Sequence, residues 1–147
     1  MKVSRAARQS GFTLLEMIVV LVIIGLIMGL VGPRLFGQAE KAKVQTANTQ
    51  VKMLGGAVQT LRLDIGRLPT KDEGLKLLVE RPAEPKAARM WAGPYLEEGL
   101  PDDPWGNAYQ YEPTASGAKA FSLWSYGADA KPGGEGNDAD VGNLPTR

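Results

Sequence analysis

The chain lacks the side chains that most enzymes use for chemistry, because it contains no histidine and no cysteine. These absences exclude Ser-His-Asp, Cys-His and thiol sites, and they leave only oxygen ligands for a metal ion. Two groups of carboxylates remain as candidates. One is Glu16, a lone acid inside an apolar run, and the other is Asp129, Asp138 and Asp140, which lie among glycines near the C-terminus.

The charge composition gives no indication of a nucleic-acid partner. Lys and Arg together number 17 and Asp and Glu 16, and no basic stripe is present. A length of 147 residues suits one modest domain preceded by a separate N-terminal segment.

That N-terminal segment predicts a membrane helix. Residues 12–36 read FTLLEMIVVLVIIGLIMGLVGPRLF, with about twenty largely apolar residues, enough to cross a bilayer. The basic residues before it place residues 1–11 in the cytoplasm and the chain after Pro33 on the far side, which in a bacterium is the periplasm. A secretory signal peptide would be cut after the apolar run, so hydropathy alone favours a plain signal anchor.

Glu16 is unexpected in that setting. A carboxylate in a bilayer costs at least ~2.5 kcal/mol unless it finds a partner, and no Lys or Arg lies within helical reach of Glu16. Cleavage after Gly11 would free the α-amino group of Phe12, about 6 Å of helical rise away. In a bundle of staggered copies, Glu16 of one chain could pair with that amine of its neighbour. Alternatively, Glu16 lies near the lipid headgroups and is merely tolerated.

The stretch SGFTLLEMIVVLVIIGLI resembles the class III signal of type IV pilins and type II secretion pseudopilins. The resemblance implies that a prepilin peptidase, a membrane aspartyl protease, cleaves after Gly11 and then N-methylates Phe12. It also implies that Glu16 takes part in assembly. Pro33 would act in assembly as well, because it lies in a stretch of helix that can melt and extend in a filament.

Beyond the membrane segment, the pattern predicts a small α+β domain. Apolar residues at spacings of three and four continue the helix to Ile65, with one inward stripe: Ala47, Val51, Leu54, Val58, Leu61 and Ile65. A capping box at Thr70–Glu73 predicts a short helix to about Glu80, with Leu75, Leu78 and Val79 facing inward. Residues 81–94 are predicted to form a loop. Strands are expected near 108–112 and in AFSLWSYG, joined by a turn at Ser116-Gly117.

The last segment has two interpretations. Its acids and glycines are typical of a solvated acidic tail, but Ca²⁺ binds six to eight oxygens on backbone that turns sharply, which glycine permits. The twelve-residue EF-hand pattern is missing.

Three stretches then resemble one branch, the G-type major pseudopilins of type II secretion (general secretion pathway protein G family): GRLPTKDEGLKLLV, GPYLEEGLPDDPWGNAYQYE and YGADAKPGGEGNDADVGN. The resemblance implies a pilin-like fold, with a long helix on a small antiparallel sheet and a calcium loop in place of a disulfide. It implies Asp129, Asp138 and Asp140 as calcium ligands, with the backbone carbonyls near Tyr126 and Lys131 as secondary ones. Ala130 departs from the glycine of many relatives.

The resulting expectation is a structural protein without enzymatic activity. Residues 1–11 are expected to form the leader, 12–35 the transmembrane half of the helix and 36–147 a periplasmic domain. Within that domain, residues 66–107 would form the loop region between the helix and the strands, 108–126 a β-hairpin, and 127–147 the calcium loop and the C-terminus. The mature chain would leave the bacterial inner membrane as a homopolymer, the pseudopilus. The expected partners are prepilin peptidase, minor pseudopilins, an inner-membrane platform and a secretion ATPase, and the role is export of folded proteins.

Other classes stay open at this point. The chain could be a type IV pilin or minor pseudopilin, or a monomeric anchored calcium-binding protein. It could also be an anchored enzyme that uses Glu97-Glu98 and Asp102-Asp103, although acidic pairs between Gly and Pro on a loop are more typical of solvated turns.

Overall fold

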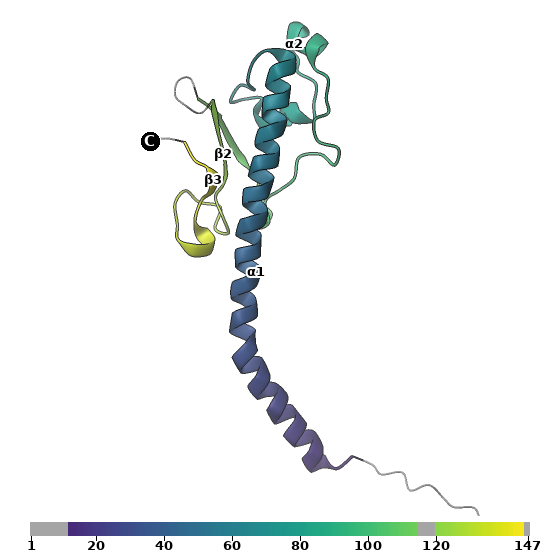
Figure 1. Cartoon of the computed structure of the whole chain (residues 1–147), viewed down its shortest axis with the longest axis vertical. Helices are drawn as coiled ribbons and strands as arrows, with labels where there is room; N and C mark the ends of the chain where they lie inside the picture. Colours follow the sequence, from purple (N-terminus) through teal and green to yellow (C-terminus); the bar gives the residue numbers. More distant parts are fainter. Residues whose placement is uncertain (1–11, 115–119, 146–147) are drawn as a thin grey trace, which may run out of the picture. The chain divides into compact units, whose positions relative to one another are not determined.

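The structure is a computed structural model that describes residues 12–114 and 120–145, and within that range the side chains of residues 33–36 are not described. Gly11 with the rest of the predicted leader, the predicted turn at Ser116-Gly117 and the side chain of Pro33 therefore lie outside the described residues. The elements follow in the order α1 (Leu14–Ile65), the 3₁₀ helix η1 (Gly74–Leu78), α2 (Pro85–Met90), β1 (Gln110–Pro113), β2 (Phe121–Ser125), the 3₁₀ helix η2 (Gly136–Asp138) and β3 (Val141–Asn143) (Figure 1). By its internal contacts the chain divides into two compact units, Met1–Ala39 and Glu40–Arg147.

The first unit contributes the apolar half of α1. Every side chain from Phe12 to Val31 is exposed, and nearly all of them are apolar. Thr13 caps the helix, because its Oγ1 accepts a hydrogen bond from the backbone N–H of Glu16 at 3.2 Å. A helix that is apolar around its whole circumference must be covered by lipid or by other helices. This half is long and apolar enough to cross a membrane, and none of it is buried within the described structure.

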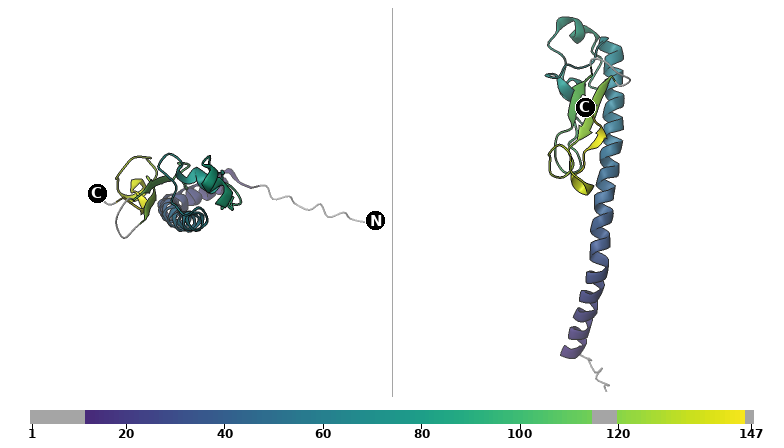
Figure 2. Two further views of the ribbon diagram at one scale, coloured as in Figure 1. Left: turned by 90° about the horizontal axis from the view of Figure 1, so that it is seen from above. Right: turned by 90° about the vertical axis from the view of Figure 1, so that its left-hand side faces the viewer.

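The second half of α1 forms one side of the core of the second unit. The predicted inward stripe is confirmed, since all six of its residues are buried: Ala47, Val51, Leu54, Val58, Leu61 and Ile65. Lys52 and Arg62 on the other face are exposed. The sheet and the loop between β2 and β3 lie along one side of this half of the helix (Figure 2, right). The buried stripe therefore fixes which face of α1 carries the small domain.

The described strands form an antiparallel sheet in the order β1-β2-β3. Tyr111 lies opposite Leu123, and Trp124 lies opposite Gly142. Phe121 and Leu123 join the α1 stripe in the core. All five residues of β2 are buried, so this central strand has protein on both faces. The strand expected near 108–112 is found as β1, Gln110–Pro113.

The strand β3 was not foreseen in the C-terminal segment, which has no core pattern in its sequence. Val141 is buried, and Gly142 allows β3 to approach β2 closely. A Cβ built on Gly142 would lie 2.7 Å from the carbonyl oxygen of Leu123 and 3.1 Å from Cγ2 of Val51. Three residues with a central glycine give no alternating signal, so the pairing depends on this close approach.

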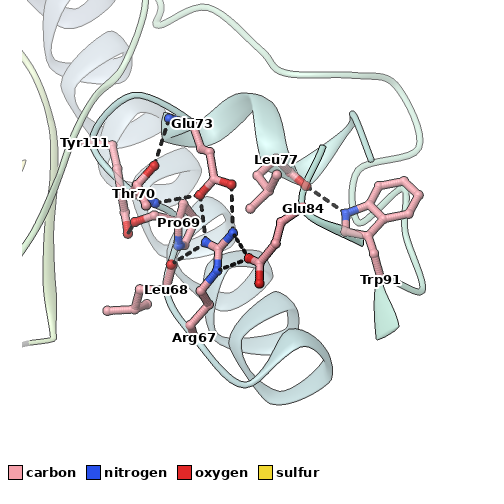
Figure 3. Close-up of polar contacts among 9 residues, drawn as sticks. All are labelled: Arg67, Leu68, Pro69, Thr70, Glu73, Leu77, Glu84, Trp91 and Tyr111. Carbon is pink, nitrogen blue, oxygen red and sulfur yellow. Dashed lines mark hydrogen bonds and ion pairs between the residues drawn. The ribbon is translucent and has the colours of Figure 1, made fainter. Parts of the chain in front are cut away.

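The chain leaves α1 as predicted. Gly66 adopts a φ of 77°, and its N–H donates to the carbonyl of Arg62 at 2.9 Å, which ends the helix. The capping box is confirmed: Glu73 N–H donates to Thr70 Oγ1 at 3.3 Å, and Thr70 N–H donates to Glu73 Oε2 at 2.8 Å (Figure 3).

Two details of the following region differ from the predictions. The short helix is the 3₁₀ element η1 and ends at Leu78; it buries Leu77 besides Leu75 and Leu78, while Val79 is only half-buried. The loop predicted over 81–94 contains α2, because Pro85 is well suited to the first helical position and Lys-Ala-Ala-Arg favours helix.

Arg67 connects the end of α1 to the segments that contain Glu73 and Glu84. Its guanidinium donates to Glu73 at 2.7 and 2.8 Å and to Glu84 at 3.1 Å (Figure 3). The hydrogen bonds from Arg67 lower the pKa of Glu73 from 4.5 to about 2, against the opposing effect of burial and with help from Thr70. Glu73 thus remains ionised well into the acid range.

This pKa predicts an acid-dependent loss of stability. A carboxylate whose pKa is lowered by folding stabilises the folded state above its unfolded pKa, and that stabilisation is lost as the pH falls towards the folded value. We therefore expect Glu73→Gln to lower the melting temperature near neutral pH and to flatten its decline between about pH 5 and pH 2. Glu80→Gln, at an exposed acid of the same segment, is the control and should keep the wild-type slope. Parallel wild-type and Glu73→Gln profiles in circular dichroism would contradict the assignment.

Candidate functional site

The N-terminal end of α1 presents a carboxylate on an exposed apolar surface. Phe12 is 78% exposed, and Glu16 lies in the first turn with its side chain exposed. Among the described residues, the ion pairs of the chain do not include Glu16. An acid at this position can favour the helix locally through the macrodipole and the capping box. It can also accept a cation from another molecule.

The second candidate is the segment between β2 and β3, residues 126–140, which we name the acidic loop. Its glycines take left-handed backbone conformations, at Gly127, Gly133, Gly134 and Gly136. Ala130 does the same, with a φ of 56°, a region in which an ordinary side chain is disfavoured. The position where the sequence departs from glycine is thus one where glycine would fit the backbone without strain.

Asp140 is the predicted ligand with the most unusual surroundings. Its Oδ2 accepts a hydrogen bond from the N–H of Gly133 at 3.0 Å. Its Oδ1 is buried and has no hydrogen-bond partner within the described structure. A buried acceptor left unpaired costs about 1–3 kcal/mol, and more when it is charged. Such an atom is suited to a cation.

The other two predicted aspartate ligands, Asp129 and Asp138, are exposed. Asp129 Oδ1 accepts a hydrogen bond from the N–H of Lys131 at 3.0 Å, and Asp138 lies in η2. Tyr126 is half-buried at the start of the loop, and Lys131 is exposed. The described residues hold no cluster of three acidic side chains ready for a metal ion. The structure therefore places the three aspartates on one loop without drawing their carboxylates together.

Backbone oxygens add to the donors of the acidic loop. A Cβ built on Gly134 would lie 2.3 Å from the carbonyl oxygen of Asp138. One built on Gly127 would lie 2.8 Å from the carbonyl oxygen of Ala139 and 2.9 Å from that of Asn137. Glycine at both positions lets the two limbs of the loop close on each other. A hollow of about 390 Å³ lies beside the loop, lined by Trp124, Tyr126, Pro132, Asp140, Leu144 and Pro145.

The burial of one further carboxylate, that of Asp103, differs from the prediction. The pair Asp102-Asp103 was interpreted as a solvated turn, and Asp102 is indeed exposed, but Asp103 is only 4% exposed. Its Oδ1 accepts backbone hydrogen bonds from Trp105 at 3.0 Å and from Asn107 at 2.8 Å. Burial raises the pKa of Tyr109, and the charge of Asp103 raises it further. The signal that could have found this residue is the Asx turn expected of Asp in Asp-Pro-Trp-Gly-Asn.

Comparison with known proteins gives consistent results over both halves of the chain. The family model described as "Type II secretion system (T2SS), protein G" matches residues 34–144. The model described as "Prokaryotic N-terminal methylation motif" matches residues 6–32. The second match covers Phe12 and Glu16, and the first covers the acidic loop.

Curated relatives are similar over nearly their whole length. The type II secretion system core protein G of Pseudomonas aeruginosa is 42% identical over 137 residues, 92% of this chain and 95% of the relative. That of Vibrio cholerae is 44% identical over 137 residues, 92% of each chain. The crystal structure of the major pseudopilin from the type 2 secretion system of enterohaemorrhagic Escherichia coli is similar with a TM-score of 0.59 and 31% identity, covering 76% of this chain and 94% of that one.

Proposed function

The chain belongs to the type II secretion system protein G family, the major pseudopilins, and we propose that it polymerises through the apolar half of α1 into a periplasmic pseudopilus. A pseudopilin is a structural subunit, so the protein is not an enzyme. The observation that carries the assembly proposal is Glu16, the one carboxylate between Phe12 and Val31, where every side chain is exposed and nearly all are apolar. Substitution of Glu16 tests the proposal, because it should stop polymerisation without stopping membrane insertion.

We propose that the precursor is processed at Gly11. The N-terminal methylation motif at residues 6–32 supports cleavage after Gly11 and methylation of Phe12. Before assembly, the apolar half of α1 would anchor the chain in the bacterial inner membrane by a single span, with the basic residues 1–11 in the cytoplasm and residues 36–147 in the periplasm.

Cleavage of the precursor would create the positive charge that assembly requires. The free amine of Phe12 is a cation that the precursor does not offer at this position, and Glu16 of an adjacent subunit can pair with it. Removing one partner of a buried pair leaves an uncompensated charge, which costs about 3–5 kcal/mol. This cost would favour staggered neighbours in one register. The secretion ATPase, the inner-membrane platform and the minor pseudopilins would act on this polymer in export of folded proteins.

We also propose that the acidic loop binds calcium. Three observations support the fit: an all-oxygen donor set, glycines at the turning positions, and the buried, unpaired Oδ1 of Asp140. Asp140 would be the central ligand, with Asp129, Asp138 and backbone carbonyls near Tyr126 and Lys131 as the others. When bound, the ion would cross-link the two limbs of the loop and neutralise their acids. Its role would be structural.

This predicts that calcium raises the melting temperature of the full chain in detergent. At a hundredfold excess over the dissociation constant, the gain is about 2.7 kcal/mol, or on the order of 10 °C for a domain of this size. Asp140→Asn should abolish the shift, because it removes the charge but can still accept the hydrogen bond from Gly133. Without calcium it should melt no lower than wild type, since the unpaired buried charge is gone.

The matched control is Asp102→Asn, at an exposed acid outside the acidic loop, which should keep the full calcium shift. Magnesium at the same concentration should produce a smaller shift, because it demands a tighter octahedral site and gives up water reluctantly. Identical melting curves of the wild-type chain in calcium and in chelator would rule out the calcium site and show that the loop is a solvated acidic tail.

A further inference from the structure

We propose that Asp103 and Ser125 set the geometry of the acidic loop from outside it, so that calcium affinity depends on two side chains that are not calcium ligands. This inference rests on the proposed calcium site. It assigns both residues a positioning role, which acts through the backbone of Gly127.

The first part of this connection is a rigid turn at residues 103–107. Asp103 Oδ1 accepts hydrogen bonds from the N–H groups of Trp105 and Asn107, and Asp103 N–H donates to the carbonyl of Asn107 at 2.8 Å. The indole Nε1 of Trp105 donates to Glu40 Oε2 of α1 at 3.4 Å. The turn is thus closed internally and attached to the helix that supports the domain.

The second part joins this turn to the end of β2. Ser125 is completely buried, and its hydroxyl donates to Asp103 Oδ2. The hydroxyl oxygen of Ser125 in turn accepts a hydrogen bond from the N–H of Gly127 at 3.0 Å. The side-chain amide of Asn107 donates to the carbonyl of Gly127 at 3.1 Å. The turn therefore holds the carbonyl of Gly127 directly, through Asn107, and its N–H indirectly, through the hydroxyl of Ser125.

The third part is the contact between Gly127 and the opposite limb of the acidic loop. Gly127 lies against the carbonyl oxygens of Asn137 and Ala139, too close to admit a side chain. The next residue, Ala128, donates its N–H to the carbonyl of Asn137 at 3.0 Å. A fixed position of Gly127 therefore also fixes the position of residues 137–139. The positions of Asp138 and Asp140 relative to Asp129 depend on this contact. The aspartates come from both limbs, so their spacing depends on this alignment.

A positioning role differs measurably from a merely structural one. Loss of a buried hydrogen bond lowers stability whether or not calcium is bound. Loss of alignment between the limbs weakens calcium binding as well, because the ligands must be ordered by the ion itself. The dissociation constant for calcium therefore separates the two roles, whereas the melting temperature of the calcium-free chain does not.

The test uses the full-length chain in detergent, freed of metal and titrated with calcium in a calorimeter. Ser125→Ala removes the hydroxyl that links Asp103 to Gly127 without adding bulk, and we expect it to weaken calcium binding about tenfold. Ser122→Ala is the matched control: Ser122 lies in the same strand, is also buried, at 3% exposure, and pairs with Glu112, away from the acidic loop. It should bind calcium as wild type does.

A second variant keeps the test decisive if Ser125→Ala fails to fold. Asn107→Ala removes the bond to the Gly127 carbonyl while leaving Ser125 and Asp103 in place, and it should also weaken binding several-fold. Wild-type affinity in the folded variants would overturn the positioning role and leave the calcium site standing. Absence of calcium binding by the wild-type chain would overturn the site and this inference together.

Discussion

Glu16→Ala and Glu16→Gln are each expected to abolish pseudopilus formation while leaving the precursor inserted in the membrane and cleaved. Insertion should even become easier, because a carboxylate in the bilayer costs at least ~2.5 kcal/mol. Assembly should fail because the amine of Phe12 in the neighbouring subunit would be buried without its counter-ion. Removing one partner of such a pair costs about 3–5 kcal/mol for each subunit added.

The two substitutions separate the intermolecular role of Glu16 from a local one. Thr13 already caps α1 through the N–H of Glu16, and a residue at the Glu16 position can return the bond in a capping box. Glutamine retains that ability and loses only the charge. If the local role dominated, Glu16→Gln would form filaments normally and Glu16→Ala would not.

The measurement is electron microscopy of filaments, with the membrane and sheared fractions compared on immunoblots. Thr13→Ser is the matched control, because it keeps a hydroxyl cap at the start of α1 and should polymerise as wild type does. Normal filaments from Glu16→Gln would rule out the charge pairing and leave the acid as a helix-capping residue.

Replacing Gly11 is expected to have an equally complete effect at an earlier step. Gly11→Val should accumulate as the full-length precursor, because the proposed cleavage follows a residue without a side chain and valine would place a branched side chain beside the bond that is cut. The uncut chain would keep Phe12 in a peptide bond, so no free amine would form and Glu16 would lack its partner. Filaments should therefore be absent as well.

The intact mass of the membrane-extracted protein reports this directly. Wild type should have lost residues 1–11 and gained one methyl group, whereas Gly11→Val should retain the leader and gain none. Ser10→Ala changes the neighbouring leader residue and should be processed normally. A cleaved and methylated product from Gly11→Val would refute the assigned site.

Several parts of the fold were predictable because they depend on neighbours in the sequence. The stripe from Ala47 to Ile65 repeats at helical spacing, so its burial follows from periodicity alone. Gly66 and the Thr70–Glu73 capping box act over one to four residues, and both form as expected. The helix α2 was missed because Pro82, Pro85 and Pro94 together suggested a loop, although a proline at the first helical position is favourable.

The sequence by itself determined the apolar N-terminal half of α1, the face of α1 that is buried and the oxygen-only chemistry of the C-terminal aspartates, since each follows from residue type and local spacing. Only the tertiary structure decided that Asp103 is buried, that Asp140 holds an unpaired oxygen and that Val141–Asn143 forms a strand. The physical reason is separation along the chain. Ser125 and Asp103 are 22 residues apart, and no local pattern encodes a hydrogen bond that forms only when β2 packs beside the 103–107 turn.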